Sequence, residues 1–208
     1  MCPDGVFSAT PGSSNATCSG VCPAGYYCTG GTQQSCGAVS KYCPEGSTSA
    51  SVVTVGHYTV DADGGTTDQL HRVAQVACEA GHWCAEGVRS ECPAGRYGSA
   101  LLLQDANCSG VCNEGYYCPA GSSSPLQHPC GGPHVYCPEG SGAPTTVGSG
   151  FYSTGGSSSS TRTGEARCEA GFYCSGGVRL ACKEGHYGES PGQTEDTCSG
   201  ECPVGTTW

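Results

Sequence analysis

The sequence predicts a fold of small disulfide-rich modules in tandem, made of short β-hairpins and irregular loops with little or no helix and arranged as an elongated rod. The first reason is the cysteine content, 19 in 208 residues. The second is periodicity, because Cys2, Cys92 and Cys182 lie 90 residues apart. The third is a shortage of aliphatic side chains. Cysteine positions that persist while the loops between them change in length indicate that the cysteines carry the fold.

The cysteine interval divides the chain into repeats. We expect a first repeat at 1–91, a second at 92–181 and the truncated start of a third at 182–208. Most cysteines of the first repeat recur 90 residues later, whereas Cys36 and Cys43 correspond to Cys130 and Cys137 at an interval of 94. Four additional residues before Cys130 are cancelled by four fewer after Cys137. Each module is expected to contact only its neighbours.

The composition argues against an ordinary apolar core. Leu, Val and Phe together make up about 12% of the chain and Ile is absent, whereas a core usually needs roughly 20% of such residues. The 35 glycines raise the backbone entropy that folding must overcome. A disulfide that closes a loop of about 15 residues contributes roughly 3 kcal/mol in the chain-entropy model. We therefore expect about eight or nine bridges to replace the missing core.

Disulfides at this density persist only in an oxidising compartment, so we expect an extracellular protein, secreted or at the cell surface. Zinc is the alternative use of many cysteines, but zinc sites favour Cys-x(2)-Cys, which does not occur here. No basic and apolar leader follows Met1, so we expect a processed product or a window of a longer chain. The longest apolar run, 100–103, is too short to span a membrane.

No pattern in the sequence predicts a catalytic site, and we expect neither enzyme activity nor a cofactor or metal. The six histidines are scattered singly, and Gly-x-Ser-x-Gly is absent. Eight basic residues against 18 acidic ones argue against a nucleic-acid partner. Asp61, Asp63 and Asp68 are spaced somewhat like a calcium loop, but the closing Glu is missing, so a solvated turn is favoured.

A short phrase recurs four times, consisting of Cys-x-x-Gly, an aromatic pair and a second Cys. Its copies are Cys22–Cys28, Cys78–Cys84, Cys112–Cys118 and Cys168–Cys174. The glycine suits a tight turn. Successive side chains of a strand point to opposite faces, so one ring is expected to pack on a disulfide and its neighbour to face outward. Gly and Pro interrupt nearly all of the remaining sequence, and only 68–76 could form a helical turn.

The phrases Cys-Pro-Ala-Gly-Arg-Tyr, Cys-Pro-Ala-Gly-Tyr-Tyr-Cys and Tyr-Cys-Pro-Glu-Gly-Ser resemble ephrin-receptor-like cysteine-rich repeats. Those repeats are related to the modules of tumour-necrosis-factor receptors and to growth-factor-like modules. The resemblance covers essentially the whole chain, and such arrays are common in large surface proteins of algae, oomycetes and other protists. It implies extracellular structure, adhesion or filamentous appendages such as flagellar hairs. Thr206, Thr207 and Trp208 depart from it, since a tyrosine pair and a cysteine would be expected there.

The resemblance also implies a set of bridges. Eighteen cysteines are expected in disulfides: Cys2, Cys18, Cys22, Cys28, Cys36, Cys43, Cys78, Cys84, Cys92, Cys108, Cys112, Cys118, Cys130, Cys137, Cys168, Cys174, Cys182 and Cys198. In the favoured scheme Cys2–Cys18, Cys92–Cys108 and Cys182–Cys198 close long loops, Cys78–Cys84 and Cys168–Cys174 pair locally, and the remaining two quartets interleave as Cys22–Cys36 with Cys28–Cys43 and Cys112–Cys130 with Cys118–Cys137. A rival scheme pairs Cys78–Cys92 with Cys84–Cys108 and Cys168–Cys182 with Cys174–Cys198. Both leave Cys202 unpaired or available for an intermolecular bond.

Several positions are candidates for covalent glycans. Asn15-Ala-Thr17 and Asn107-Cys-Ser109 are N-glycosylation sequons in polar loops. The stretch 143–163 resembles an O-glycosylated linker, with a bare flexible loop as the alternative, and 47–67 is its equivalent. The O-glycosylation candidates are Ser157, Ser158, Ser159, Ser160 and Thr161.

Two functions remain open at this point. The first is a non-enzymatic structural glycoprotein of the cell exterior, a disulfide-stapled rod that assembles with copies of itself or with neighbouring repeats into a filament, appendage or coat. The second is a receptor or adhesion ectodomain that binds a protein or glycan. A ligand site would interrupt the regularity that a rod preserves, and the segment 61–76 is the main interruption.

Overall fold

The computed structural model describes residues 2–9 and 18–205. Regular structure in these residues consists of 22 short strands paired as two-stranded antiparallel hairpins, and they contain no helix. The predicted fold of small disulfide-rich hairpin modules is therefore confirmed within the described residues. The segment 68–76 contains no helical turn, because its end belongs to strand β8 (Ala74–Ala77).

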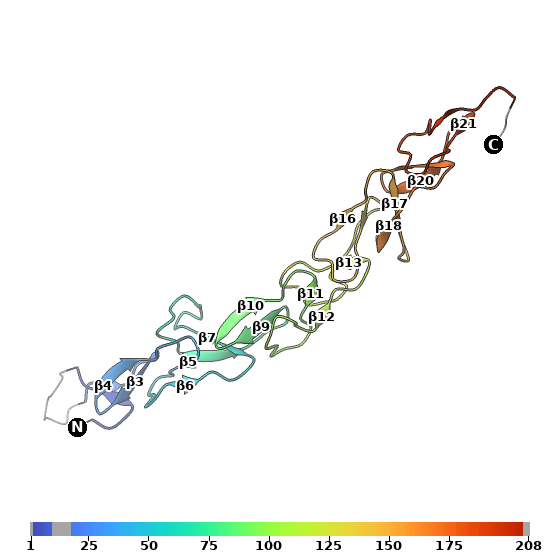
Figure 1. The fold of residues 1–208 in the computed structure, drawn as a ribbon. Coiled ribbons are helices and arrows are strands. Elements are labelled where there is room, and N and C mark those ends of the chain that lie inside the picture. Colours follow the sequence, from blue (N-terminus) through green and yellow to red (C-terminus); the bar gives the residue numbers. More distant parts are fainter. Residues whose placement is uncertain (1, 10–17, 206–208) are drawn as a thin grey trace. The chain divides into compact units, whose positions relative to one another are not determined.

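The chain divides into two compact units, which Figure 1 shows as successive hairpins. The first unit comprises residues up to Glu91 together with Gly98–Cys108. Its strands pair in sequence order: β1 (Val6–Phe7) with β2 (Gly20–Val21), β3 (Tyr26–Thr29) with β4 (Thr32–Ser35), β5 (Lys41–Tyr42) with β6 (Ser51–Val52), β7 (His57–Val60) with β8, and β9 (His82–Ala85) with β10 (Val88–Glu91).

The second unit comprises Cys92–Tyr97 and the residues from Ser109 onward. It repeats the same order of hairpins and begins a third series. Its pairs are β11 (Arg96–Tyr97) with β12 (Gly110–Val111), β13 (Tyr116–Tyr117) with β14 (His128–Pro129), β15 (Val135–Tyr136) with β16 (Thr145–Thr146), β17 (Phe151–Thr154) with β18 (Gly164–Arg167), β19 (Phe172–Ser175) with β20 (Val178–Ala181), and β21 (His186–Tyr187) with β22 (Gly200–Glu201).

Every hairpin in the described residues carries an aromatic residue at the second position of its first strand. These residues are Phe7, Tyr27, Tyr42, Tyr58, Trp83, Tyr97, Tyr117, Tyr136, Tyr152, Tyr173 and Tyr187. In most hairpins a glycine with positive φ directly precedes the strand, as at Gly25 (φ 85°) and Gly150 (φ 76°). Because this backbone region costs glycine little, the chain reverses there and the next two residues enter the strand.

Backbone hydrogen bonds link each hairpin to the following segment in the same way. The N–H of Cys22 donates to the carbonyl of Gly5, that of Cys36 to Gly25 and that of Cys78 to Gly56. The second unit repeats this pattern, for example from Cys168 to Gly150 at 2.9 Å. In these hairpins the turn glycine therefore accepts the amide of the cysteine that follows the hairpin, whatever the length of the loop between them.

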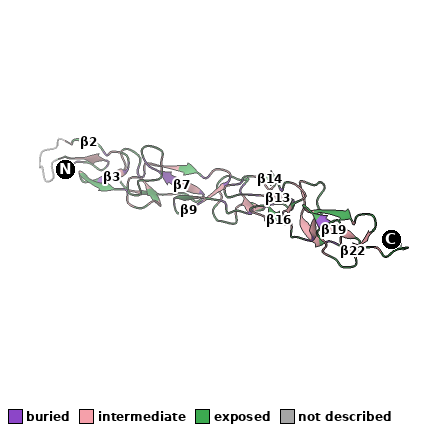
Figure 2. Cartoon of the chain, turned by 90° about the horizontal axis from the view of Figure 1, so that it is seen from above, coloured by how far each residue is buried: buried purple, intermediate pink, exposed green. Residues whose placement is uncertain are grey.

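The interior of both units consists mainly of sulfur. The buried apolar side chains of the described residues are cysteines and a single aliphatic residue, Val60. Figure 2 shows the resulting pattern, in which buried segments are brief interruptions within half-buried and exposed strands such as β7 and β19. The aromatic rings are half-buried rather than core residues, so the disulfides and backbone hydrogen bonds carry most of the packing.

The structure locates the two compensating changes in loop length. In the first unit β3 and β4 are joined by the tight turn Gly30–Gly31, whereas β13 and β14 are separated by the longer loop 118–127. The opposite change lies between β7 and β8, whose loop 61–73 is longer than the loop 155–163 between β17 and β18. Both changes fall at hairpin ends, where length can vary without moving the cysteines.

Candidate functional site

Disulfides follow the hairpins and most of them are local. The structure has Cys2–Cys18, Cys22–Cys28, Cys36–Cys43, Cys78–Cys84, Cys112–Cys118, Cys130–Cys137, Cys168–Cys174 and Cys182–Cys198, and Cys92 and Cys108 are also disulfide-bonded. The Cα atoms of Cys22 and Cys28 lie 5.7 Å apart, inside the normal range for a disulfide. Chemically, each bond closes the turn that precedes an aromatic strand.

The interleaved quartets expected from the family resemblance are wrong. Cys22–Cys36 with Cys28–Cys43 is replaced by Cys22–Cys28 and Cys36–Cys43, and Cys112–Cys130 with Cys118–Cys137 is replaced by Cys112–Cys118 and Cys130–Cys137. The rival interleaving of Cys78 and Cys168 is wrong for the same reason. In the four copies of the recurring phrase, a glycine turn three residues after the first cysteine folds the chain back, so the second cysteine of the same phrase is its partner.

Cys202 is a free, half-exposed thiol. Its N–H donates to the carbonyl of Gly185 at 2.7 Å, as those of Cys22 and Cys112 donate to Gly5 and Gly95. Cys202 therefore occupies the position of the first cysteine in the recurring phrase. The corresponding second position is Trp208, which lies outside the described residues together with Thr206 and Thr207.

The acidic loop after β7 is a turn in which Asp63 and Asp68 are exposed, as expected of a solvated turn, whereas Asp61 is not. Asp61 is buried, and its carboxylate accepts hydrogen bonds from the N–H of Gly65 (2.7 Å), the N–H of Asp68 (3.2 Å) and the hydroxyl of Thr67 (3.3 Å). Asp68 in turn accepts from the N–H of Leu70. Oxygens that accept backbone amides are directed at donors and not at a shared cation, and the described residues hold no cluster of three metal-ligating side chains.

These hydrogen bonds lower the pKa values of both carboxyl groups. The N–H of Asp68 is the main cause for Asp61, followed by the N–H of Gly65 and the hydroxyl of Thr67. For Asp68 the main causes are the N–H of Leu70 and the ring of His71, whose Nδ1 lies 2.9 Å from the carboxylate. Hydrogen bonds to the charged form of an acid favour that form, so this loop is built around ionised carboxylates.

An arginine closes the same loop in each unit, a feature that the sequence reasoning missed. Arg72 is only 3% exposed and donates to the carbonyls of Gly65 (3.1 Å) and Thr66 (2.6 Å). Arg162 lies 90 residues later and donates to the carbonyl of Gly155 (3.0 Å). The backbone carbonyl of each arginine also accepts from a cysteine, Cys43 or Cys137. The repeat interval was the signal that could have identified this pair.

A cluster of tyrosine, arginine and glutamate recurs where the cysteine-free hairpin meets the next hairpin. In the first unit the guanidinium of Arg89 lies over the Tyr58 ring and pairs with Glu79. In the second, Arg179 lies 5.4 Å from the centre of the Tyr152 ring and 4.5 Å from that of Phe172, and it pairs with Glu169 at 3.1 Å.

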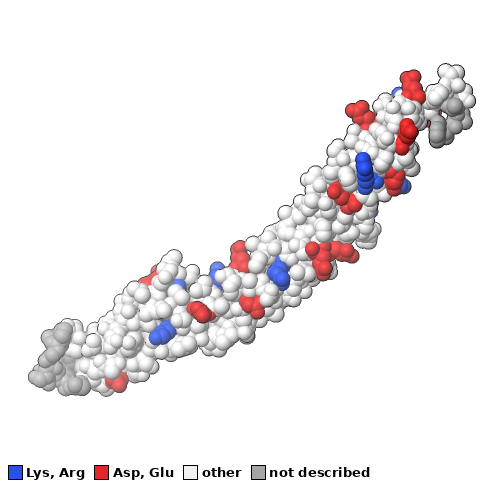
Figure 3. Space-filling view, in the orientation of Figure 1, with Lys and Arg blue, Asp and Glu red and all other residues white. Residues whose placement is uncertain are grey.

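The two clusters also differ in a hydrogen bond. The Tyr152 hydroxyl donates to Glu169. The N–H of Glu169 itself, then this hydroxyl and then Arg179 lower the pKa of the Glu169 carboxyl. These clusters are the Arg–Glu ion pairs of the described residues, and Figure 3 shows how sparsely charged residues are scattered over the drawn face.

Two histidines rest on tyrosine rings. His71 lies 4.6 Å from Tyr26 and His128 lies 5.1 Å from Tyr117, measured between ring centres. His82, which replaces an aromatic residue in the recurring phrase, lies on strand β9 with its Nδ1 3.7 Å from a Glu79 carboxylate oxygen.

The predicted glycan positions differ in their surroundings. Asn15 lies outside the described residues. Asn107 is exposed, and its N–H donates to the Asp105 carboxylate. In the serine-rich loop the hydroxyls of Ser158, Ser160 and Thr161 bond to one another.

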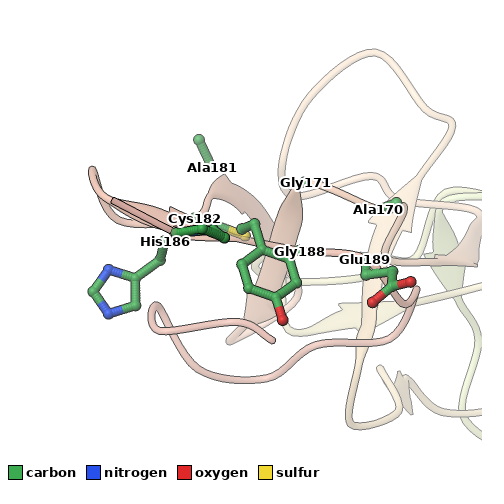
Figure 4. Close-up of a pocket in the computed structure, with 9 residues that line it drawn as sticks. Ala170, Gly171, Ala181, Cys182, His186, Gly188 and Glu189 are labelled. Atoms are coloured by element: carbon green, nitrogen blue, oxygen red, sulfur yellow. The ribbon is translucent and has the colours of Figure 1, made fainter. Parts of the chain in front are cut away.

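A concavity in the second unit lies between hairpins β19–β20 and β21–β22. It encloses about 820 Å³ and includes Cys182, His186 and Glu189 in its lining. Figure 4 shows the His186 ring pointing away from Cys182, with the Glu189 carboxylate at the other end of the lining. The two titratable side chains do not converge, so the arrangement has no acid–base pair.

No protein-family model matches this chain, and no curated protein matches it significantly. The residues described by the structure include no helix with the length and apolar character of a membrane span. The disulfide frame fits an oxidising, extracellular environment.

Proposed function

We propose that this chain is part of a non-enzymatic structural glycoprotein of the cell exterior, a repeat rod that assembles into a filament, surface appendage or coat. The observation that carries the proposal is the regularity of the hairpins. Each begins with an aromatic strand, and the turn glycine accepts the amide of the next cysteine in both units. A protein built this way gains length by adding modules without redesigning its interior.

The chemistry of the frame supports the same role. Stability rests on local covalent bonds and backbone hydrogen bonds rather than on a large core. Local disulfides keep a module closed even when its neighbours are strained, because each bond limits the extension of its own loop. An ephrin-receptor-like array of the type found in algal and protist surface proteins remains the family that we propose.

Glycans are the second component of the proposal. The hydroxyls of Ser157 and Ser159 are on exposed residues beside the bonded set Ser158, Ser160 and Thr161. We therefore place O-linked sugars first at Ser157 and Ser159, and N-linked sugars at Asn15 and Asn107. Peptide mapping of secreted material by mass spectrometry tests these positions.

A receptor or adhesion ectodomain is the alternative, and the loop 61–73 favours it. This loop interrupts the regular series with a buried carboxylate and a buried arginine, which hold its backbone in one shape. A rigid, unique loop on a repetitive scaffold is a common form of binding site.

Electron microscopy of secreted, oxidised protein separates the two functions. The structural role predicts long fibres of uniform width that disappear when the sample is reduced. A concentration series of monodisperse short particles, with no larger species in sedimentation, would instead support the ectodomain.

A further inference from the structure

The second unit carries a small polar groove whose lining residues differ from the corresponding residues of the first unit. It lies beside β17 and β20 and encloses about 400 Å³. Its lining includes Ser153, Thr154 and Gly155. It also includes Arg162, from the loop of the same hairpin, and Arg179, from β20 of the next hairpin. No Asp or Glu belongs to the lining among the described residues.

Three residues of the groove lining differ from their counterparts in the first unit. The first unit has Thr59, Val60 and Asp61 at the positions of Ser153, Thr154 and Gly155, which follow from the alignment of β7 with β17. Thr59 is fully buried and its hydroxyl donates to the carbonyl of Val39 at 2.6 Å, and Val60 is 8% exposed. Thr59 carries one methyl group more than Ser153, and Val60 has a methyl group where Thr154 has a hydroxyl. Asp61 then adds a carboxylate where the second unit has only glycine.

The two units also differ in the charged groups at this place. The first unit places the Asp61 carboxylate in the same loop as Arg72. In the second unit, Nη1 of Arg162 donates to the carbonyl of Gly155, and its buried Nε has no hydrogen-bond partner among the described residues. Arg179 lines the same groove and is balanced by Glu169, which lies outside the lining. The groove is therefore positive in a chain whose net charge is −10.

We propose that this groove binds the carboxylate or sulfate group of an acidic sugar. Guanidinium groups can donate two parallel hydrogen bonds to a pair of oxygens on such anions, and these bonds are charge-assisted. The Thr154 side chain and the Tyr152 ring add further contact surface for a sugar, whereas the buried Ser153 hydroxyl already donates to the Gly177 carbonyl. A volume near 400 Å³ suits one monosaccharide, whereas a protein partner would need roughly 800 Å² of buried surface on each side.

The test is an NMR titration of the full oxidised chain with glucuronic acid, with glucose as the neutral match and with sodium sulfate. Glucuronate and sulfate are expected to shift the amides of 152–155, 162 and 177–179 with dissociation constants on the order of millimolar. Added sodium chloride should weaken this binding, because both partners are charged and the site is open to solvent. Glucose should leave these amides unchanged.

Three variants with one matched control identify the contact. Arg162→Gln should weaken glucuronate binding about tenfold or more, since a hydrogen bond to a charged group is lost, and Arg162→Lys should weaken it less. Ser153→Thr with Thr154→Val copies the first unit at these two positions, adds one methyl group, replaces one hydroxyl with a methyl group and should weaken glucuronate binding without disturbing the fold. Arg167→Gln makes the same charge change on β18, outside the groove lining, and should bind as the parent does.

Several results would overturn the proposal. Equal loss with Arg162→Gln and Arg167→Gln would reduce the effect to net charge, and equal shifts with glucose would remove the role of the anion. Shifts that appear only with self-association in sedimentation would point to an acidic surface of a second copy instead. The amide spectrum and disulfide mass of each variant check that it has folded.

Discussion

The cysteine-free hairpins β7–β8 and β17–β18 occupy the same place in the two repeats, and they close their loops by different chemistry. In the first, the Asp61 carboxylate gathers the N–H groups of the loop. In the second, hydroxyls of Ser158, Ser160 and Thr161 bond to one another. Both keep an arginine that donates to loop carbonyls. The two repeats therefore share the arginine that closes the hairpin loop, whereas the groups that order the rest of the loop differ.

The largest expected effect should erase this difference altogether. Reduction of the disulfides should unfold both hairpins together, since the cysteines on either side are the core of each unit. Circular dichroism and amide dispersion should both collapse to those of a disordered chain, whereas a chelator should change neither. Unfolding by the chelator alone would show that metal rather than disulfide bonds holds the chain.

The arginines provide the next largest effect and a direct contrast. Arg72→Ala should cost about 2 kcal/mol of unfolding free energy, because a buried side chain that donates charged hydrogen bonds to two loop carbonyls is lost. Arg162→Ala should cost about 1 kcal/mol, because this side chain is half-buried and makes one such bond. Denaturant unfolding of the two variants and the parent measures both free-energy changes. Equal costs would mean that the acidic loop does not depend on its arginine more than the serine loop does.

The sequence was sufficient to predict the hairpin modules but not their contacts. Cys-x-x-Gly followed by an aromatic pair identified the turn and strand at Cys22 and Cys112, and both are hairpins. The same Gly-x-aromatic pattern at Gly56-His57-Tyr58 and Gly150-Phe151-Tyr152 was present without cysteines and was missed. A pattern tied to cysteine hides the wider rule, which is a positive-φ glycine before an aromatic strand.

Disulfide pairing and side-chain burial depend on the three-dimensional path of the chain, so the sequence alone did not predict them. The sequence spacing of Cys22, Cys28, Cys36 and Cys43 allows both local and interleaved bonds, and only the direction of the chain after Gly25 decides between them. Burial of Asp61 and Arg72 depends on how a long loop folds over itself, which short-range propensity does not specify. The groove beside Ser153 likewise depends on how a hairpin loop and the following hairpin come together, which the sequence does not specify.

Low pH should destabilise the loop 61–73 more than the loop 155–163. The pKa values of Asp61 and Asp68 lie below their usual value of 3.8, so their contribution to stability is complete above the unfolded pKa and is lost as pH falls through the folded pKa. Amide exchange in 61–73 should therefore accelerate below about pH 4, while 155–163, which contains no acidic residue, should respond later. Asp61→Asn should remove much of this pH dependence, and its persistence would assign the effect elsewhere.

The smallest expected effect compares the aromatic clusters. Arg179→Gln should lower the melting temperature slightly more than Arg89→Gln, because Arg179 covers the rings of Tyr152 and Phe172 whereas Arg89 covers only that of Tyr58. Both ion pairs are exposed and contribute little. High salt should screen the glutamate pairing and leave most of the ring contact, so the difference between the two variants should persist at 1 M NaCl, where the Debye length is about 3 Å. If salt abolishes the difference, charge pairing rather than contact with the second ring distinguishes the two units.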